Sequence, residues 1–261
     1  MNSKTIISGV LFFYATSLIS HPICISLGDG CGPAFMLRDL GIRKEAFPFD
    51  WTVSYWDAFI RAFTDDFQFF LTDLKMRPGN QGVIDYYGIH FTHDWPTNEN
   101  PHIDALNADF IGNNELFHSW QQALPLVRQK YARRIERFRN VCRGRDKVIF
   151  IRSEMSDSSS DVTVMQNKAI AIRDYLKSQY PTLNFTLVYI SGNPVFQEPW
   201  NIDRIKNFYD TNWHNPNGLA HMLKQVDRAF NNLRQVSHAR IRRSELEFNA
   251  GYWLEDEMDL D

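Results

Sequence analysis

Cysteine and histidine side chains in this sequence could carry nucleophilic chemistry. Cys31 lies in the stretch "SLGDGCGPAF". A catalytic thiol needs a base that takes its proton and later returns it to the leaving group. The two candidate bases are His93, which Asp94 follows directly, and His214, which Asp210 precedes by four residues. His93 is favoured, with His214 close behind, and the pattern predicts a cysteine-nucleophile hydrolase.

The residues around Cys31 predict a strand that ends in a sharp turn and then a helix. Apolar residues alternate over 23–27, as in a strand, and glycines follow. Pro33 suits the first turn of a helix. At a helix N-terminus, free N–H groups and the helix dipole favour a thiolate. The amides near Gly30 and Gly32 are therefore expected to stabilise an oxyanion, and the same loop would suit a bound anion.

The second half of the chain alternates between strand and helix patterns. Strands are predicted over 147–152, 184–191 and 205–210, and helices over 162–179 and from about 216 to 236. This alternation predicts an α/β fold in layers, with a mostly parallel sheet flanked by helices.

Parallel α/β sheets place their chemistry at the carboxyl ends of the strands. The Cys31 turn, Arg152 and the segment 210–218 would meet there. We therefore expect Arg152 to bind an anionic group of the substrate, while Asp29 and Asp94 are candidates for orienting the base.

Other elements are expected between these two regions. The sequence predicts a helix over 56–63, a strand or hairpin within 82–96, and a long helix over about 114–142 that Pro125 kinks or splits. His90 and His93 are three residues apart, so on a strand they would point to opposite faces. They do not make a convincing metal site, and no metal is predicted.

Composition excludes several partners. The 261 residues carry a net charge of −3, which gives no attraction to nucleic acid. The basic stretch 127–147 fits the solvated face of a helix. The chain has neither a Walker loop nor a Rossmann glycine pattern with its acidic partner, so no organic cofactor is predicted.

The termini frame one expected domain. Residues 1–20 resemble a signal peptide, with one lysine, a mostly apolar run and small residues at its end. We therefore expect export to the periplasm or beyond, with no stable membrane span after cleavage. If the segment is not cleaved, it would serve as an anchor. A single domain is expected over 21–245, followed by an acidic tail over 246–261. The three cysteines are an odd number, so at least one thiol stays unpaired within the chain.

The stretch "SLGDGCGPAFMLRDLGIRKEAFPFDW" resembles the opening signature of a bacterial family of unknown function whose members are predicted to be papain-like cysteine peptidases. "GIHFTHDW" resembles that family's histidine–aspartate block, and "KVIFIRSE" its strand ending in arginine. The likeness spans roughly residues 22–190 in order. It implies that Cys31 is the nucleophile, His93 the base and Asp94 its orienter, with a peptide or small acyl substrate. The α/β pattern of 147–236 does not look like papain.

Two alternatives stay open. "SLGDG" followed late by "DTNWHNPNGLAH" resembles SGNH-type esterases, although Gly30 stands at the serine position, so only a cysteine variant fits. A protein without catalysis could instead use the glycine turn to hold a phosphate or carbohydrate group, with tryptophans stacking on it. A thiol with a depressed pKa would favour the enzyme, and a buried, unreactive thiol would favour the binder.

Overall fold

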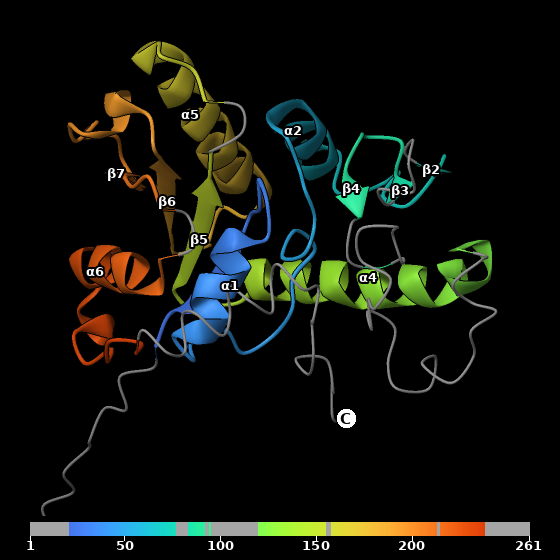
Figure 1. The fold of residues 1–261 in the computed structure, drawn as a ribbon, viewed down its shortest axis with the longest axis horizontal. Coiled ribbons are helices and arrows are strands. Elements are labelled where there is room, and N and C mark those ends of the chain that lie inside the picture. The colour runs from blue at the N-terminus through green and yellow to red at the C-terminus, as the bar shows by residue number, and fades with distance from the viewer. Residues whose placement is uncertain are drawn as a thin grey trace, which may run out of the picture.

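The core of the protein is a four-stranded parallel sheet with strand order β1–β5–β6–β7 (Figure 1). The computed structural model describes residues 21–76, 83–91, 94, 120–154, 158–212 and 215–237. The strands of this sheet are β1 (Ile23–Ser26), β5 (Val148–Ser153), β6 (Phe185–Ser191) and β7 (Ile205–Tyr209). Helices flank the sheet, and the predicted α/β fold with a mostly parallel sheet is confirmed.

Because all four strands run in the same direction, their carboxyl ends lie along one edge of the sheet. Ser26 of β1 is level with Ile151 of β5, and Ile190 of β6 is level with Phe208 of β7. We call the end of the sheet from which the chain leaves these strands the carboxyl edge. The turn that holds Cys31 follows β1 at this edge.

Helices cover both faces of the sheet. On one face lie α1 (Gly32–Asp39) and α6 (Pro216–Val226), which pack on Ile149 and Ile151 of β5. The other core joins α2 (Trp56–Thr64), α4 (Trp120–Arg143) and α5 (Val162–Gln179) to Phe150 of the same strand. Successive residues of a strand point to opposite faces, so the continuous apolar run of β5 serves both cores.

The core on the α2 side is aromatic, and Phe49 lies within it. Its ring centroid is 5.0 Å from that of Phe59 and 5.5 Å from that of Phe67. Phe59 in turn stacks on Phe63 at 5.1 Å. Offset and edge-to-face aromatic pairs of this kind add to the free energy gained by burial. Through Phe49, the block Pro48–Trp51 fastens the loop after α1 to the layer formed by α2 and α4.

A second, antiparallel sheet contains β2 (Lys75–Met76), β3 (Val83–Ile84) and β4 (His90–Phe91). It confirms the predicted hairpin over the part of 82–96 that is described. His90 also pairs with Val53 through two backbone hydrogen bonds of 2.9 and 3.0 Å. This bridge joins the small sheet to the loop that leads into α2.

Two predicted helices differ in their details. Helix α4 includes Pro125 and continues through it, so the predicted split does not occur there. Its predicted start near residue 114 lies outside the described residues. Helix α6 ends at Val226 instead of reaching 236, because Asp227 leaves the helical conformation. The Asp227 carboxylate accepts a hydrogen bond from the Ala229 amide and pairs with Lys147.

The expected signal segment and the acidic tail lie outside the described residues, so export and the domain limits stay predictions. Within the described part of the chain, no helix has both the length and the apolar character needed to cross a membrane.

The turn before Cys31 leaves no room for a side chain at Gly28. Gly28 has φ +76, and a Cβ there would lie 2.6 Å from Ser54 Oγ and 3.2 Å from the Phe49 carbonyl oxygen. Gly41 has a similar φ of +68 but nothing within 4 Å of such a Cβ. We predict that Gly28→Ala lowers the free energy of unfolding by about 3 kcal/mol, and Gly41→Ala by about 1 kcal/mol from backbone strain alone. Urea denaturation measures both, and equal losses would contradict the close approach.

Candidate functional site

Cys31 lies at the carboxyl edge, where the chain turns from β1 into α1. It is the N-cap residue of α1, and its carbonyl oxygen accepts a hydrogen bond of 3.0 Å from the Phe35 amide. Pro33 occupies the first turn of the helix, as the sequence predicts. The expected sequence of strand, glycine turn and helix is therefore present, and it places Cys31 at the helix N-terminus.

The thiol of Cys31 is a buried neutral group in this structure. The residue is 6% exposed and forms no disulfide. Burial raises the pKa of Cys31 to about 12, and hydrogen bonding to the backbone opposes this only in part. Removal from water disfavours a thiolate more strongly than this helix N-terminus stabilises it. Any nucleophilic chemistry at Cys31 therefore needs a base that removes the proton.

Asp94 is anchored on α4. Its Oδ1 atom is 2.6 Å from Lys130 Nζ, and its Oδ2 atom accepts a hydrogen bond of 2.8 Å from the Tyr131 hydroxyl. Burial opposes ionisation of Asp94, but the charges of Lys130 and Arg134 outweigh it and lower its pKa. Burial also lowers the pKa of Lys130 to about 8, in spite of its carboxylate partner. Both oxygens of Asp94 are thus engaged by the helix, and His93 lies outside the described residues.

Asp210 follows β7 at the carboxyl edge, as the sequence predicts. Its amide donates to the Ser191 carbonyl oxygen at 3.0 Å, and its Oδ1 atom accepts from the Asn212 amide at 2.8 Å. Asn215 caps the N-terminus of α6 by accepting a hydrogen bond from the Gly218 amide. His214 lies outside the described residues. The loop before α6 therefore begins on the same edge of the sheet as the Cys31 turn.

Arg152 is completely buried, and protein groups surround its guanidinium. Nη1 donates to the Leu27 carbonyl oxygen at 2.9 Å, and Nη2 donates to the Ser54 carbonyl oxygen at 2.9 Å. Nε donates to Glu154 at 3.3 Å, and the guanidinium lies 4.2 Å from the centre of the Phe59 ring. Arg152 lies beside the Cys31 turn, as expected, and in this structure it binds the protein itself. Gly30 and Gly32 flank Cys31, and Gly32 is the first residue of α1.

The residues that support Arg152 were not predicted from the sequence. Glu154 accepts hydrogen bonds from Lys168 Nζ at 3.0 Å and from the Tyr189 hydroxyl at 2.8 Å. Glu154 is fully buried, and Lys168 reaches it from α5. One signal was available: "IRSE" places two opposite charges at the end of an apolar strand, where each needs a buried partner.

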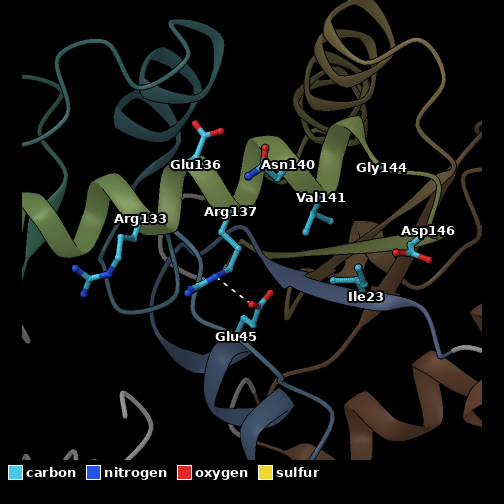
Figure 2. Close-up of a pocket in the computed structure, with 9 residues that line it drawn as sticks. All are labelled: Ile23, Glu45, Arg133, Glu136, Arg137, Asn140, Val141, Gly144 and Asp146. Atoms are coloured by element: carbon cyan, nitrogen blue, oxygen red, sulfur yellow. Dashed lines mark ion pairs between the residues drawn. The ribbon is translucent and has the colours of Figure 1, made fainter. Parts of the chain in front are cut away.

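A surface pocket of about 560 Å³ lies at the other end of β1 (Figure 2). Figure 2 shows α4 along one side of it and the start of β1 on the other. It is lined by Ile23, Glu45, Arg133, Glu136, Arg137, Asn140, Val141, Gly144 and Asp146. The ion pair between Arg137 and Glu45, at 3.3 Å, crosses it. This pocket opens beside the first residue of β1, whereas Cys31 follows the last, so the two are separate features.

The other cysteines do not join Cys31. Cys24 and Cys142 are buried, and neither is in a disulfide. Burial raises the pKa of Cys24 to about 12 and raises that of Cys142 as well. Within the described ranges, no three His, Cys, Asp or Glu side chains are grouped as a metal ion would require.

Comparison with known proteins identifies the family. A family model with the description "Putative papain-like cysteine peptidase (DUF1796)" matches residues 23–193. The chain belongs to this family. The match begins at β1 and ends just after β6, so it includes Cys31, Asp94 and Arg152 but stops before Asp210.

One relative among curated proteins is viral. An uncharacterized protein of Acanthamoeba polyphaga mimivirus is 27% identical over 176 residues, which are 62% of this chain and 75% of the relative. The bacterial origin expected from the resemblance is therefore not established by this relative, which is viral. No solved structure matches the chain significantly.

Removal of one member of the buried ion pair between Asp94 and Lys130 should destabilise the fold strongly. Removing one member of such a pair leaves the other charge buried without compensation. We predict that Asp94→Asn lowers the free energy of unfolding by about 3 kcal/mol at pH 7. The matched control is Asp73→Asn, which breaks a pair with Lys75 of 3.2 Å at the surface and should leave the urea midpoint almost unchanged. Similar midpoints for the two variants would show that the buried pair adds little.

Proposed function

We propose that this protein is a cysteine hydrolase that cleaves an acyl bond in a peptide or small acyl substrate. The observation that carries the proposal is the position of Cys31 as N-cap of α1 at the carboxyl edge, in a chain of this family. Parallel α/β proteins bind ligands at this edge. The helix N-terminus also supplies backbone donors for a developing oxyanion.

In the proposed reaction, a histidine takes the proton of Cys31 as the sulfur attacks the carbonyl carbon. The oxyanion that forms is stabilised by amides of the turn, with Gly30 and Gly32 as candidates. The histidinium then protonates the leaving group, and an acyl-enzyme thioester remains. Water then attacks the thioester while the histidine takes a proton from it. The C–S bond breaks, the acid product leaves, and the histidinium returns its proton to the Cys31 sulfur.

His93 is the first candidate for the base. The family match includes it and stops before His214. Asp94 is held by Lys130 and Tyr131, so we propose that it contributes by fixing the backbone next to His93 rather than by pairing with the imidazole.

The state of Cys31 predicts the pH dependence of hydrolysis. Its pKa of about 12 means that a thiolate does not form unaided at neutral pH, so the active form needs a neutral imidazole. We predict that kcat/KM rises with pH through the pKa of that histidine, about 6.5 if unperturbed. The full chain is assayed with p-nitrophenyl acetate from pH 5 to 9. A rate that stays high down to pH 5 would instead indicate a preformed thiolate–imidazolium pair.

Substitution of the nucleophile tests the proposal directly. Cys31→Ala should reduce ester and peptide hydrolysis to the background rate, because the covalent intermediate cannot form. Cys24→Ala is the matched control, since it removes a thiol that is also buried and also has a pKa of about 12. Hydrolysis that survives in Cys31→Ala, or that falls equally in both variants, would overturn the proposal.

One observation favours a second candidate, an SGNH-like esterase with cysteine in place of serine. The strands that precede Cys31 and Asp210 end at the same edge, and α1 and α6 pack on the same face through Leu37 and Leu219. In this case His214 would be the base. Loss of hydrolysis in His214→Ala but not in His93→Ala would select this arrangement.

The buried Cys31 thiol, whose pKa is raised to about 12, meets the expectation stated above for a binding protein without catalysis. For such a protein we expect no hydrolysis of esters or peptides and slow alkylation of Cys31 at every pH up to 9, with no effect of either histidine substitution. Catalysis is distinguished from it by turnover that depends on Cys31 and on one histidine.

A further inference from the structure

Two other segments of the chain hold the backbone of residues 27–29, shortly before Cys31, by hydrogen bonds. The Leu27 carbonyl oxygen accepts from Arg152 Nη1 at 2.9 Å. The Gly28 carbonyl oxygen accepts from the Ser153 amide at 3.3 Å and from Ser153 Oγ at 3.1 Å. Both donors stand at the carboxyl end of β5, which is the strand next to β1.

Ser54, in the loop before α2, holds the backbone of Asp29. The Asp29 amide donates to Ser54 Oγ at 3.3 Å, and the Asp29 carbonyl oxygen accepts from the Ser54 amide at 3.0 Å. Arg152 joins the two sides, because Nη1 donates to Ser54 Oγ at 3.3 Å and Nη2 to the Ser54 carbonyl oxygen at 2.9 Å. Ser54 and Asp29 are both almost completely buried. We call Ser54, Arg152 and Ser153 the turn clamp.

The clamp acts where the backbone is strained. Gly28 has φ +76, and Asp29, which is not a glycine, has φ +87. Aspartate tolerates a positive φ better than most residues, and other residues of this chain also have one, but the φ of Asp29 lies beyond the usual left-handed range, so its hydrogen bonds are needed to hold it. Asp29 comes two residues before Cys31, so the geometry forced on it determines where the chain enters α1.

A further set of buried charges fixes the clamp itself. Arg152 Nε donates to Glu154 at 3.3 Å, and Glu154 also binds Lys168 at 3.0 Å and Tyr189 at 2.8 Å. Arg152 lies 4.0 Å from Asp29 Oδ1 as well. The charges of two carboxylates and two cations balance in this buried group, so the guanidinium is held in one orientation.

We propose that Ser54 and Arg152 are positioning residues that hold the strained Asp29 turn and thereby set the place and burial of the Cys31 thiol. Neither touches the substrate in this proposal, and Arg152 is not an anion-binding group. The consequence for catalysis rests on the proposed function, but the control of the Cys31 thiol by the clamp does not depend on it.

The test compares two buried serines in the full chain. Ser54→Ala removes the hydroxyl that binds Asp29 and Arg152. Ser191→Ala removes an equally buried hydroxyl at the end of β6, where it donates to the Glu154 carbonyl oxygen at 2.8 Å, accepts from the Asn193 amide at 3.2 Å and lies 3.1 Å from Ser158 Oγ. It forms no described hydrogen bond to residues 27–31 or to the Glu154 carboxylate that binds Arg152. Losses of thermal stability should be similar, because each variant loses buried hydrogen bonds.

The readout is the rate of iodoacetamide labelling at each cysteine from pH 6 to 9, measured by peptide mass. We expect Cys31 to react at least about tenfold faster in Ser54→Ala, since the variant loses two buried hydrogen bonds and the loss of even one changes an opening equilibrium by about that factor. Its pH profile should also move toward that of an exposed thiol. In Ser191→Ala the rate at Cys31 should stay as in the unchanged protein. Cys24 and Cys142 report general unfolding and should stay slow in both variants.

A second variant keeps the proposal testable if Ser54→Ala does not fold. Ser153→Ala removes only the Oγ contact to Gly28 and keeps the backbone contact, so it should accelerate labelling of Cys31 in the same direction by about threefold. Equal labelling of Cys31 in the clamp variants and in Ser191→Ala would overturn the proposal. So would acceleration at all three cysteines together.

Turnover separates this proposal from the proposed function. If the protein hydrolyses p-nitrophenyl acetate, Ser54→Ala should lower kcat with little change in KM, even though its Cys31 is easier to alkylate. If the unchanged protein hydrolyses no ester or peptide, the proposed function fails. The clamp would still stand on the selective change in labelling.

Discussion

The hydrogen bonds of the buried Arg152 guanidinium are the interactions on which the rest of the site depends. An unpaired charge with no access to water would cost several kcal/mol, so the fold must provide partners for it. It does so with Glu154 and with the carbonyl oxygens of Leu27 and Ser54. Those partners belong to the end of β5, the end of β1 and the loop before α2. The hydrogen bonds of this one side chain therefore join three segments that are far apart in the sequence, and the Cys31 turn is one of them.

The helix N-terminus and burial have opposite effects on the pKa of Cys31 in this fold. A cysteine at a helix N-terminus is usually expected to be acidic, because N–H groups and the helix dipole stabilise the thiolate. Here α1 has only eight residues and its first turn is packed, with Gly32, Pro33 and Ala34 all buried. Desolvation then dominates and raises the pKa of Cys31 to about 12. The local motif is the one expected of a nucleophile, whereas the protonation state follows from tertiary packing.

Local sequence patterns predicted where most strands and helices lie. They did not predict which side chains pair across segments that are far apart in the sequence. The strands β5 and β6 are continuous apolar runs of the kind that a two-sided sheet buries, so their places were predicted closely. The predicted end of α6 was wrong because Asp227 is extended and caps the short helical turn Arg228–Phe230; its carboxylate also pairs with Lys147, which is remote in the sequence. Arg152 was predicted at the carboxyl edge from its strand alone. Its hydrogen bonds to Ser54 were not predicted, because Ser54 comes from the loop before α2. Residue types alone do not show which segment packs against a buried side chain.

Asp94 shows the same limit at the site itself. Its place next to His93 suggested a carboxylate that orients an imidazole, which is an argument from sequence adjacency. In the structure both carboxylate oxygens face α4, where Lys130 and Tyr131 take them up, and the charges of Lys130 and Arg134 keep its pKa low. Each carboxylate oxygen can accept a second hydrogen bond, so an orienting role of Asp94 toward His93 stays a prediction. Asp94 can also define the path of the chain beside it, because a side chain pinned at 1% exposure also pins its own backbone. Asp94 is thus held through its carboxylate, whereas Asp29, the buried acid before Cys31, is held through its backbone hydrogen bonds to Ser54.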